Sequence, residues 1–481
     1  MPIETIALPV GGLDDRDPYT LAPDRSPNLR NVRSHRQRMV KGPGSTLWAA
    51  APASPGTPRS FAQVHFVSPT ERLLMLTHTK AFRWDTATSA WVDLSEAYTG
   101  AASQRFSVAN TQDRAVWSQG TNNIRNYNGS TVSQLVNHAA RTLLAFNDRV
   151  ISVYTNEGDG EHPARIRWSV NAVITDWTGL GSGSLEVIET SNAPLTGGFV
   201  LGERAYLTKA REIIELIATG SLSPVFRQET RISGTGMIAR HSFGAAEYFG
   251  FFLGPDDVYL WDGASLRPVG AAVYKTITAL LDYATLDTVQ GVVHTTDSEY
   301  WLIVSETAEG GVFIYDYRAD RWYRDHWPNV RALGIFRTGD TLTADIDQSE
   351  FVILGDSNAK TVRINPAAAA YDGVAIDSYF ETRDMPARSF AGRETRVALD
   401  RLNTCYRVSG VATAQTEIGL SNDQGATYTT QTVDQTADHE QVKGFFVQPY
   451  QRLRIRMRNN SVNAWAVKGA LEYEWVMSGV A

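Results

Sequence analysis

The sequence has a single cysteine, Cys405, among its 481 residues. One cysteine excludes a disulfide within the chain and a zinc site built from several thiolates. The opening segment, MPIETIALPVGGLDD, has neither a basic stretch nor a long apolar run, so we expect no signal peptide. The most apolar stretch, residues 248–253, is too short to span a bilayer, so we expect no membrane anchor. These absences predict a chain that folds in a cytosol-like compartment.

The chain also lacks an excess of basic residues. Its 45 Lys and Arg are outnumbered by 52 Asp and Glu, which gives a formal net charge of -7. A protein that coats nucleic acid needs the opposite balance, so that class is excluded. A conduit through which DNA passes without specific binding remains compatible with this charge.

Motifs for enzyme chemistry are missing. The nine histidines are scattered, with no His-x-His and no His-Glu-x-x-His spacing, and there is neither a Walker loop nor a Gly-x-Ser-x-Gly elbow. The glycine-rich piece at residues 179–183 precedes no helical pattern, so it is not a phosphate loop. We therefore predict no enzyme, with no catalytic residue, no cofactor and no metal ligand. A glycoside hydrolase stays open as an alternative, because its carboxylates can come from distant parts of a chain.

Short apolar runs broken by glycine, aspartate, asparagine or proline fill most of the sequence, which is typical of β-strands. One pattern recurs: an apolar pair, an aromatic residue, then Asp or Asn and often Gly, as in AFRWD, NIRNYNG, DVYLWDG and VFIYDYRADRW. Its anchors, three of them weaker, are Trp84, Tyr127, Trp168, Leu216, Trp261, Tyr315 and Ile364. Asp-Gly or Asn-Gly would form a two-residue hairpin turn, and the aromatic residue would pack between adjacent units.

The anchors lie 41 to 54 residues apart. A propeller blade of four short strands needs roughly 40–50 residues, so the spacing predicts an all-β protein with a β-propeller of about seven blades over residues 59–370. Six or eight blades are alternatives, and so is a large sandwich or irregular β array.

The two flanks of the repeat differ from it. Residues 1–58 are rich in Pro, Asp, Arg and Asn, and we expect an extended N-terminal arm that lies on another domain or on a partner. For residues 371–481 we predict a β-sandwich-like platform domain, which is joined to the propeller at the Ala-rich residues 367–370. Its expected strands are residues 376–381, 396–399, 406–411, 416–420, 428–433 and 451–457.

The platform contains the segment SNDQGATY at residues 421–428, which matches an Asp-box pattern. In this pattern Ser421, Asp423, Gly425 and Thr427 form a structural hairpin turn, in which the carboxylate accepts backbone amides and the glycine takes a positive φ. The box is associated with sialidases, where it lies away from the catalytic site. A single copy predicts a turn and no glycan chemistry.

Two basic segments are candidate assembly interfaces. The first lies in the arm and comprises Arg30, Asn31, Arg33, Arg36, Arg38 and Lys41. The second comprises Arg452, Arg454, Arg456 and Arg458, which alternate with apolar residues. On a strand, this alternation places the four arginines on one face, where they must meet carboxylates, a partner or water. We expect charge reversal at Arg454 and Arg456 to block assembly and leave the monomer folded; a solvated sheet face is the alternative.

The N-terminal motifs carry a family resemblance. GGLDDRDP at residues 11–18, SPNLRNVR at 26–33 and RMVKGPG at 38–44 resemble the opening of tail nozzle proteins (tail tubular protein B type) of short-tailed bacteriophages. The residue-level match covers about residues 10–45, whereas the layout of arm, propeller and terminal β region matches over the whole chain. This chain is shorter than many nozzle proteins, which puts an accessory fibre-docking domain in doubt.

The resemblance implies a structural virion protein in the phage tail, assembled in the host cytoplasm. It implies a homo-oligomeric ring of six subunits that binds the adaptor (head-to-tail connector) protein, supports a tail fibre or spike, and lets double-stranded DNA pass. The alternatives are a carbohydrate-binding or glycoside-hydrolysing propeller and a peptide-binding scaffold propeller. The carbohydrate-active propeller is disfavoured because the sequence lacks a secretion signal and disulfides, and the scaffold propeller is disfavoured because it lacks the Gly-His and Trp-Asp signature of WD40 repeats.

Overall fold

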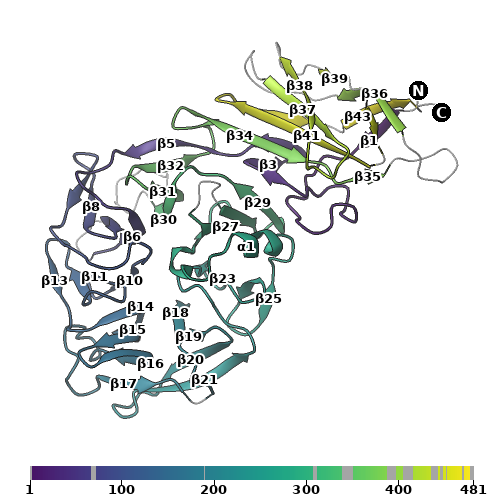
Figure 1. Cartoon of the computed structure of the whole chain (residues 1–481). Helices are drawn as coiled ribbons and strands as arrows, with labels where there is room; N and C mark the ends of the chain where they lie inside the picture. The colour runs from purple at the N-terminus through teal and green to yellow at the C-terminus, as the bar shows by residue number, and fades with distance from the viewer. Residues whose placement is uncertain are drawn as a thin grey trace.

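The computed structural model describes residues 3–66, 72–188, 190–306, 311–337, 350–386, 397–404, 415–434, 442–444, 448–450, 452–468 and 471–476. These residues form strands β1 to β43, one short α-helix, α1 (Tyr274–Leu280), and one 3-10 helix, η1 (Leu286–Thr288). Figure 1 shows a ring of sheets, with a second β-rich body attached at one side. No helix in the described part of the chain is long and apolar enough to cross a membrane.

Six antiparallel sheets of four strands follow one another along the chain and form blades 1 to 6. Blades 1 to 3 are β6–β9 (Pro58–Val64, Arg72–Thr77, Ala81–Asp85, Ala90–Asp93), β10–β13 (Ser107–Thr111, Arg114–Ser118, Arg125–Tyr127, Val132–Gln134) and β14–β17 (Ala139–Phe146, Arg149–Glu157, Gly160–Trp168, Gly183–Glu186). Blades 4 to 6 are β18–β21 (Leu195–Leu201, Arg204–Lys209, Glu212–Ala218, Phe226–Ser233), β22–β25 (Gly244–Ala245, Gly250–Leu253, Val258–Trp261, Leu266–Pro268) and β26–β29 (Gln290–His294, Glu299–Ser305, Gly311–Asp316, Arg321–Asp325).

The seventh blade combines the two ends of the propeller sequence. It contains β30 (Val330–Arg337), β31 (Glu350–Asp356), β32 (Thr361–Asn365) and, as its fourth strand, β5 (Gly44–Ala49) from the N-terminal segment. Strand β30 also contacts β6 of blade 1, so the ring is closed (Figure 1). The predicted boundary at residue 58 is therefore wrong for β5, which belongs to the propeller because it covers the otherwise unpaired edge of β32.

The repeat read from the sequence is confirmed as a structural repeat. All seven anchors lie in the third strand of their blade, in β8, β12, β16, β20, β24, β28 and β32. Buried apolar clusters lie between neighbouring blades, and the anchors belong to them: Trp84 packs between blades 7 and 1, Tyr127 between blades 1 and 2, and Trp261 between blades 4 and 5. These clusters explain why an aromatic residue recurs at this position, since a large side chain fills the gap between two sheets.

The turns after the anchors differ from the prediction. After Trp261 the chain makes a four-residue connection, residues 262–265, instead of a two-residue hairpin turn. The Asp262 carboxylate accepts the backbone N–H groups of Ala264 and Ser265 at 2.9 and 2.6 Å, and Gly263 takes a φ of 89°. Asn128 caps the corresponding turn of blade 2 in the same way. The side chain thus replaces a backbone partner, which lengthens the turn.

The platform contains two further groups of strands. The larger one is continuous with blade 7 and comprises β33 (Ala370–Tyr371), β34 (Val374–Glu381), β41 (Arg452–Ser461), β37 (Gln415–Ser421) and β38 (Thr429–Asp434), with β2 (Leu29–Arg30) on β34 and β35 (Met385–Pro386) on β41. The other comprises β1 (Ile3–Ile6), β43 (Leu471–Val476), β36 (Val397–Thr404), β39 (Val442–Gly444) and β40 (Gln448–Tyr450). The predicted strands of this region are found, except that residues 406–411 lie outside the described residues.

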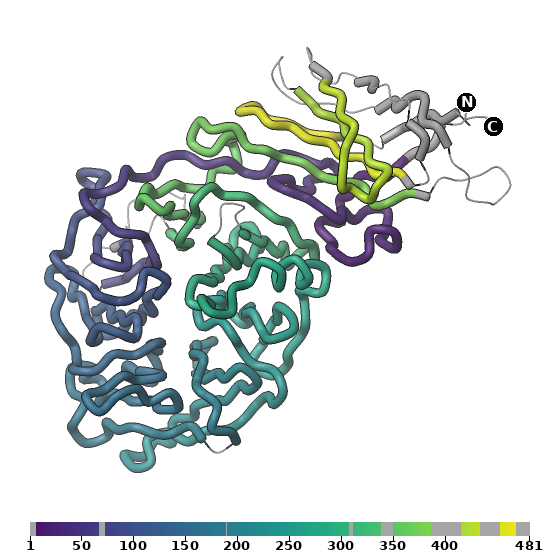
Figure 2. The backbone as a smooth tube through the Cα atoms, viewed as in Figure 1, coloured from purple at the N-terminus to yellow at the C-terminus, as the bar shows by residue number. Residues whose placement is uncertain are grey.

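The N-terminal arm crosses the whole length of this junction. It supplies β1 and β2 to the platform, a hairpin of β3 (Val32–His35) and β4 (Arg38–Lys41) that pairs with β42 (Ala466–Lys468), and β5 to the propeller. The tube in Figure 2 follows this segment, in purple, from the platform to the first blades. The arm is therefore not a loose extension, because its strands β1 to β5 all pair with strands of its own chain.

Candidate functional site at the junction of propeller and platform

The first motif of the arm, the GGLDDRDP segment at residues 11–18, binds to blades 5 and 6. The Leu13 N–H donates to the Trp322 carbonyl at 2.8 Å, and the Asp15 N–H donates to the Ala272 carbonyl at 2.7 Å. Gly12 has a φ of 92°, and a Cβ at this position would lie 2.7 Å from the Trp322 carbonyl oxygen. The backbone can therefore approach the blade this closely only with glycine at position 12.

Asn31 is a buried hydrogen-bonding centre of the junction. It is 1% exposed and has a φ of 53°, a left-handed conformation that asparagine tolerates. Its Nδ2 donates to the Asp377 carbonyl at 2.7 Å, and its Oδ1 accepts the His326 N–H at 2.7 Å and the Tyr371 hydroxyl at 2.9 Å. One side chain thus links the arm to the platform strand β34 and to the end of blade 6.

Arg33 forms a buried ion pair with the propeller. Its two terminal nitrogens donate to both carboxylate oxygens of Asp325, at 2.7 and 2.5 Å. The Asp325 side chain is 1% exposed, so the pair is shielded from water. Burial lowers the pKa of Arg33, but the Asp325 carboxylate outweighs burial and raises it overall. A bidentate pair of this kind fixes both distance and orientation between hairpin and blade.

Lys41 is also buried, on the platform side. Its Nζ donates to Asn459 Oδ1 at 3.2 Å, to the Asn463 carbonyl at 3.3 Å and to the Ser461 carbonyl. Burial lowers the pKa of Lys41 to about 8, although the charge of Asp377 opposes this effect. Lys41 thus holds the end of β41 and is not a free surface charge.

The other residues of the first basic segment divide into two groups. Arg30 lies in β2 and is half-buried beside Tyr379 of β34. Arg36 and Arg38 lie in and directly after the two-residue turn of the β3–β4 hairpin, where both side chains are exposed. Of the six predicted interface residues, the structure therefore buries Asn31, Arg33 and Lys41 within the chain and presents Arg36 and Arg38 on the surface.

The arginines of β41 find carboxylates in the same chain. Arg454 is 6% exposed and donates to Asp384 at 2.7 Å and to Glu381 at 3.2 Å. Arg456 pairs with Glu417 at 3.0 Å. The apolar residues between them, Leu453, Ile455 and Met457, are buried in the main core, as the alternation predicts.

Arg458 and Arg452 are the remaining two arginines of β41. Arg458 pairs with Asp377 at 2.6 Å and with Glu417 at 3.7 Å. Arg452 begins β41, and its side chain lies outside the described part of the structure. The expectation that charge reversal at Arg454 would leave the monomer folded needs correction, because reversal would place three carboxylates together in a buried site.

The Asp-box segment forms the predicted turn between β37 and β38. The Asp423 carboxylate accepts the Thr427 N–H at 2.9 Å and its hydroxyl at 2.5 Å, and the Ser421 hydroxyl donates to it at 2.6 Å. Gly425 has a φ of 88°. The Ser421 and Thr427 bonds lower the pKa of Asp423 to about 2. Both oxygens of this carboxylate accept hydrogen bonds within its own turn.

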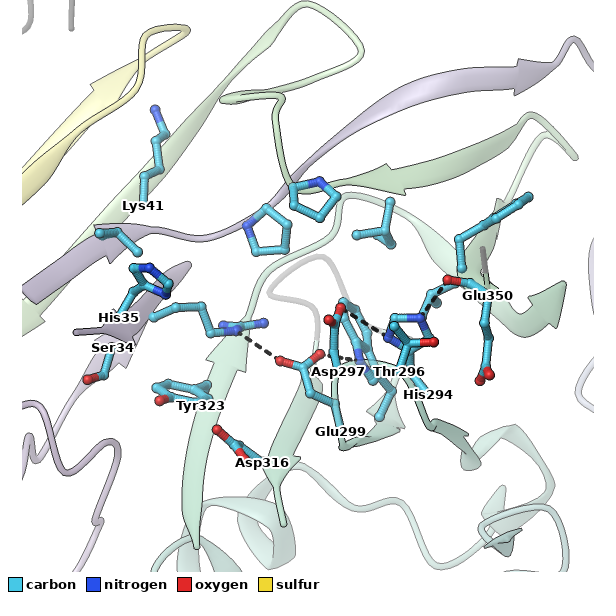
Figure 3. A pocket seen from close by; sticks show the side chains of 18 of the residues that line it. Ser34, His35, Lys41, His294, Thr296, Asp297, Glu299, Asp316, Tyr323 and Glu350 are labelled. Atoms are coloured by element: carbon cyan, nitrogen blue, oxygen red, sulfur yellow. Dashed lines mark hydrogen bonds and ion pairs between the residues drawn. The ribbon is translucent and has the colours of Figure 1, made fainter. Parts of the chain in front are cut away.

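A cavity of about 640 Å³ lies where the β3–β4 hairpin, blade 6 and blade 7 meet. Figure 3 shows its labelled side chains, with Ser34, His35 and Lys41 on the hairpin side and Glu299 and His294 on the side of blade 6. The cavity is therefore bounded by both the arm and the propeller.

Three side chains of this cavity form a cluster that sequence reasoning missed. His294 ends β26, Glu299 begins β27 directly opposite it, and Asp297 lies in the turn between them. Their ligand atoms all lie within 4.8 Å of one another. Neither the His-x-His nor the His-Glu-x-x-His spacing applies, because these residues meet across a β-hairpin. A His-x-x-Asp-x-Glu pattern over a predicted turn was the available signal.

Burial and charge act together on the cluster. Burial raises the pKa of Glu299 to about 6, although the nearby Arg33 charge opposes the shift. Burial lowers the pKa of His294, but its contacts with Asp297 and the Glu350 carbonyl outweigh burial and raise it overall. The cluster therefore combines a buried imidazole with two carboxylates that have few cationic neighbours.

A second cavity, of about 450 Å³, is lined by the innermost strands of several blades. Its described lining includes Arg240, His241, Asn110 and Gln290, but no Asp or Glu. Close by, the fully buried Arg105 donates to the Thr288 carbonyl, the Arg59 carbonyl and Gln290. The described residues around the propeller axis thus offer no pair of carboxylates to this cavity.

Comparisons with known proteins leave the function open. No family model matches the chain, and no curated protein matches it. Among solved structures, it is similar to YCF48 bound to D1 peptide (11% identity, 66% of this chain and 94% of that chain, TM-score 0.37) and to YCF48 from Cyanidioschyzon merolae (12%, 66% and 99%, 0.39). It is also similar to the extracellular domain of the putative hybrid two component system BT4673 from B. thetaiotaomicron (9%, 81% and 47%, 0.42). At these identities and scores none of them informs the function, and the description of the propeller rests on its strand pairing.

Proposed function

We propose that this protein is a non-enzymatic structural subunit of a phage tail, in which copies of the chain form a nozzle ring below the adaptor protein. In this role the ring extends the channel for double-stranded DNA and supports a fibre or spike. The proposal begins from the N-terminal motifs, which resemble those of nozzle proteins. The observation that carries it further is the way in which these same motifs join the propeller to the platform.

The motif residues have structural tasks that suit a subunit under mechanical load. Gly12 allows the arm to pack on blade 6, Asn31 and Arg33 connect the arm to both bodies, and β5 completes blade 7. A channel component must keep its domains in fixed orientation while DNA moves past it. Hydrogen bonds and a buried bidentate ion pair supply that fixed orientation.

The exposed tip of the β3–β4 hairpin is the surface that we assign to assembly. Its backbone is held by pairing with β42 and by the Arg33–Asp325 ion pair, so the tip projects from a rigid base. Arg36 and Arg38 present two positive charges there on a chain whose net charge is -7. Guanidinium groups in such a position suit an acidic patch on a neighbouring subunit or on the adaptor.

The runner-up, a glycoside-hydrolysing propeller, requires two carboxyl groups about 5 to 9.5 Å apart around a sugar. The described lining of the axial cavity has no Asp or Glu, so nothing in that cavity favours the runner-up.

The test is the mass of the chain in solution, measured by light scattering with and without a purified adaptor ring. We expect a defined complex with several copies of the chain when the adaptor is present. The double variant Arg36→Glu/Arg38→Glu should remain monomeric under the same conditions and keep its circular dichroism spectrum, because both side chains are exposed.

Arg211→Glu is the matched control. Arg211 is also an exposed arginine in a two-residue hairpin turn, between β19 and β20 of blade 4, and its reversal should leave assembly unchanged. If the double variant assembles normally, the hairpin tip is not part of the assembly interface. A wild-type chain that stays monomeric with the adaptor and cleaves glycans would overturn the proposed function itself.

A further inference from the structure

The hydrogen bonding of His294 fixes where its ring carries a proton. Nε2 lies 2.8 Å from the Glu350 carbonyl oxygen, which can only accept, so Nε2 carries the hydrogen. In neutral imidazole Nδ1 then holds a lone pair, and Nδ1 lies 3.2 Å from Asp297 Oδ2. Two electron-rich atoms at this distance repel each other unless a proton or a metal ion lies between them.

Glu299 adds a second carboxylate to the same point. The Trp301 Nε1–H donates to its Oε2 at 2.8 Å, and one of its carboxylate oxygens lies within 4.8 Å of the ligand atoms of His294 and Asp297. The nearest described cation is Arg33, whose Nε lies 3.9 Å from Oε1, but both terminal nitrogens of Arg33 already bind Asp325. The two carboxylates of the cluster are therefore only partly neutralised by the chain.

The distances fit direct coordination of an ion. In a tetrahedral site with bonds of about 2.0–2.1 Å, two ligand atoms lie about 3.3 Å apart. Nδ1 and Asp297 Oδ2 lie 3.2 Å apart, and all three ligand atoms of the cluster lie within 4.8 Å. A histidine that ligates a metal typically donates its other N–H to a carbonyl or carboxylate, which is the bond that His294 makes to Glu350.

We propose that His294, Asp297 and Glu299 bind a divalent first-row transition-metal ion. One imidazole nitrogen and two carboxylate oxygens suit Zn²⁺ or Mn²⁺, and the adjoining cavity leaves room for water at the remaining positions. The ion joins the β26–β27 turn of blade 6 and, through the His294 bond to Glu350, the start of β31 in blade 7. Its place is the cavity at the junction of propeller and platform (Figure 3).

A second cluster of the same composition serves as an internal comparison. Glu157, Asp159 and His162 also lie within 4.8 Å of one another, at the tip of the β15–β16 hairpin. Both carboxylate oxygens of Glu157 are already engaged, one by Thr155 and Arg165 and the other by Arg167. This cluster therefore lacks a free ligand atom on its most buried member, and we expect it to bind no ion.

The test uses the full chain, stripped with EDTA and then dialysed against one equivalent of ZnCl₂ or MnCl₂. We expect close to one bound ion per chain by inductively coupled plasma mass spectrometry, and a higher melting temperature with the ion than without it. Asp297→Asn should weaken binding by about tenfold or more in isothermal titration calorimetry, since a lost metal contact typically has an effect of this size. Asp297 is largely exposed, so this variant should fold normally.

Asp159→Asn is the matched control, and it should bind as tightly as the wild type. Equal binding by the wild type and Asp297→Asn would overturn the site, and so would the absence of bound metal from the wild type, which would leave a protonated His294 between the carboxylates. Glu299→Gln provides a second variant in case Asp297→Asn alters the melting temperature of the metal-free chain. It should also lose the ion, and retention of the ion would contradict the proposal.

Discussion

At the scale of single residues, the junction depends on buried polar groups whose partners lie far away in the sequence. Asn31 satisfies three groups at once, one in the platform, one at the end of blade 6 and one on Tyr371. Arg33 lies 292 positions from Asp325, its partner in the ion pair. Because these groups are shielded from water, each depends on its protein partner for a hydrogen bond.

Removing the Asn31 side chain should therefore be costly. Asn31→Ala leaves the Asp377 carbonyl, the His326 N–H and the Tyr371 hydroxyl without their partner, so we expect the free energy of unfolding to fall by about 3–5 kcal/mol. Urea denaturation followed by circular dichroism measures this difference. Asn171→Ala is the control, since Asn171 is exposed and makes a single bond to the Asn147 carbonyl, and it should change stability by less than about 0.5 kcal/mol.

The sequence could identify these residues but not their environment. The density of arginine in the arm and on β41 was visible, and it was interpreted as an interface. Arg33 and Arg454 are instead buried against Asp325, Glu381 and Asp384, and no local pattern indicates which distant carboxylate a given arginine will meet. Local chemistry was more predictable: the Asp423 turn was foreseen because all its bonds lie within five residues.

At the scale of elements, β5 is the strand on which the propeller depends most. It pairs with β32 along its whole length, and its Trp48 packs against Trp84 of blade 1 and against Phe336 and Phe351 of blade 7, with ring centroids 5.2 to 5.6 Å apart. The neighbouring residue Leu47 is 50% exposed. The backbone of β5 thus completes the sheet of blade 7, and its Trp48 side chain fills the gap between blades 7 and 1.

The contrast between the packed Trp48 and the exposed Leu47 gives a matched pair of variants. Trp48→Ala should lower the free energy of unfolding by about 3 kcal/mol, because it empties a packed aromatic cluster between blades 7 and 1. Leu47→Ala, one residue earlier at an exposed side chain, should change it by less than about 0.5 kcal/mol. Thermal and urea unfolding of the two variants measure both values. Equal losses would mean that Trp48 does not close the ring by packing.

The elements of the propeller were largely predictable, and the reason is physical. Each blade repeats a similar interface, so a large apolar anchor, aromatic in five of the seven blades, recurs in each third strand and its spacing counts the blades. Strand β5 could not be assigned in this way, because it contains no anchor and its partner, β32, lies at the far end of the propeller sequence. The hairpin that brings His294 to Glu299 was missed for a related reason, since the relevant spacing depends on strand register.

At the scale of the whole molecule, the arm joins two β domains. Blade 7 and the larger platform sheet are continuous through β5 and β33, and the arm adds Asn31, Arg33 and the β3–β4 hairpin to the same junction. A domain interface held in this way should transmit unfolding from one body to the other.

Differential scanning calorimetry tests this coupling. The wild-type chain should unfold in a single transition, whereas Arg33→Met leaves Asp325 buried without its partner, a loss of about 3–5 kcal/mol, and should separate the platform from the propeller into two transitions. The scans are recorded in EDTA, so that a metal ion does not contribute. Arg165→Met removes an arginine paired within blade 3 alone and should keep a single transition. Two transitions in the wild type would contradict the coupling.

The pairing of β5 with β32 also sets the order of events as the chain is made. The N-terminal strands leave the ribosome first, yet their partners are synthesised near the end; the Ser26 hydroxyl, for example, bonds the Glu381 carbonyl 355 residues later. Contacts this distant in sequence form slowly, since a long loop must close before they give any stability. The nascent arm therefore lacks these partners until all six four-stranded blades have been synthesised.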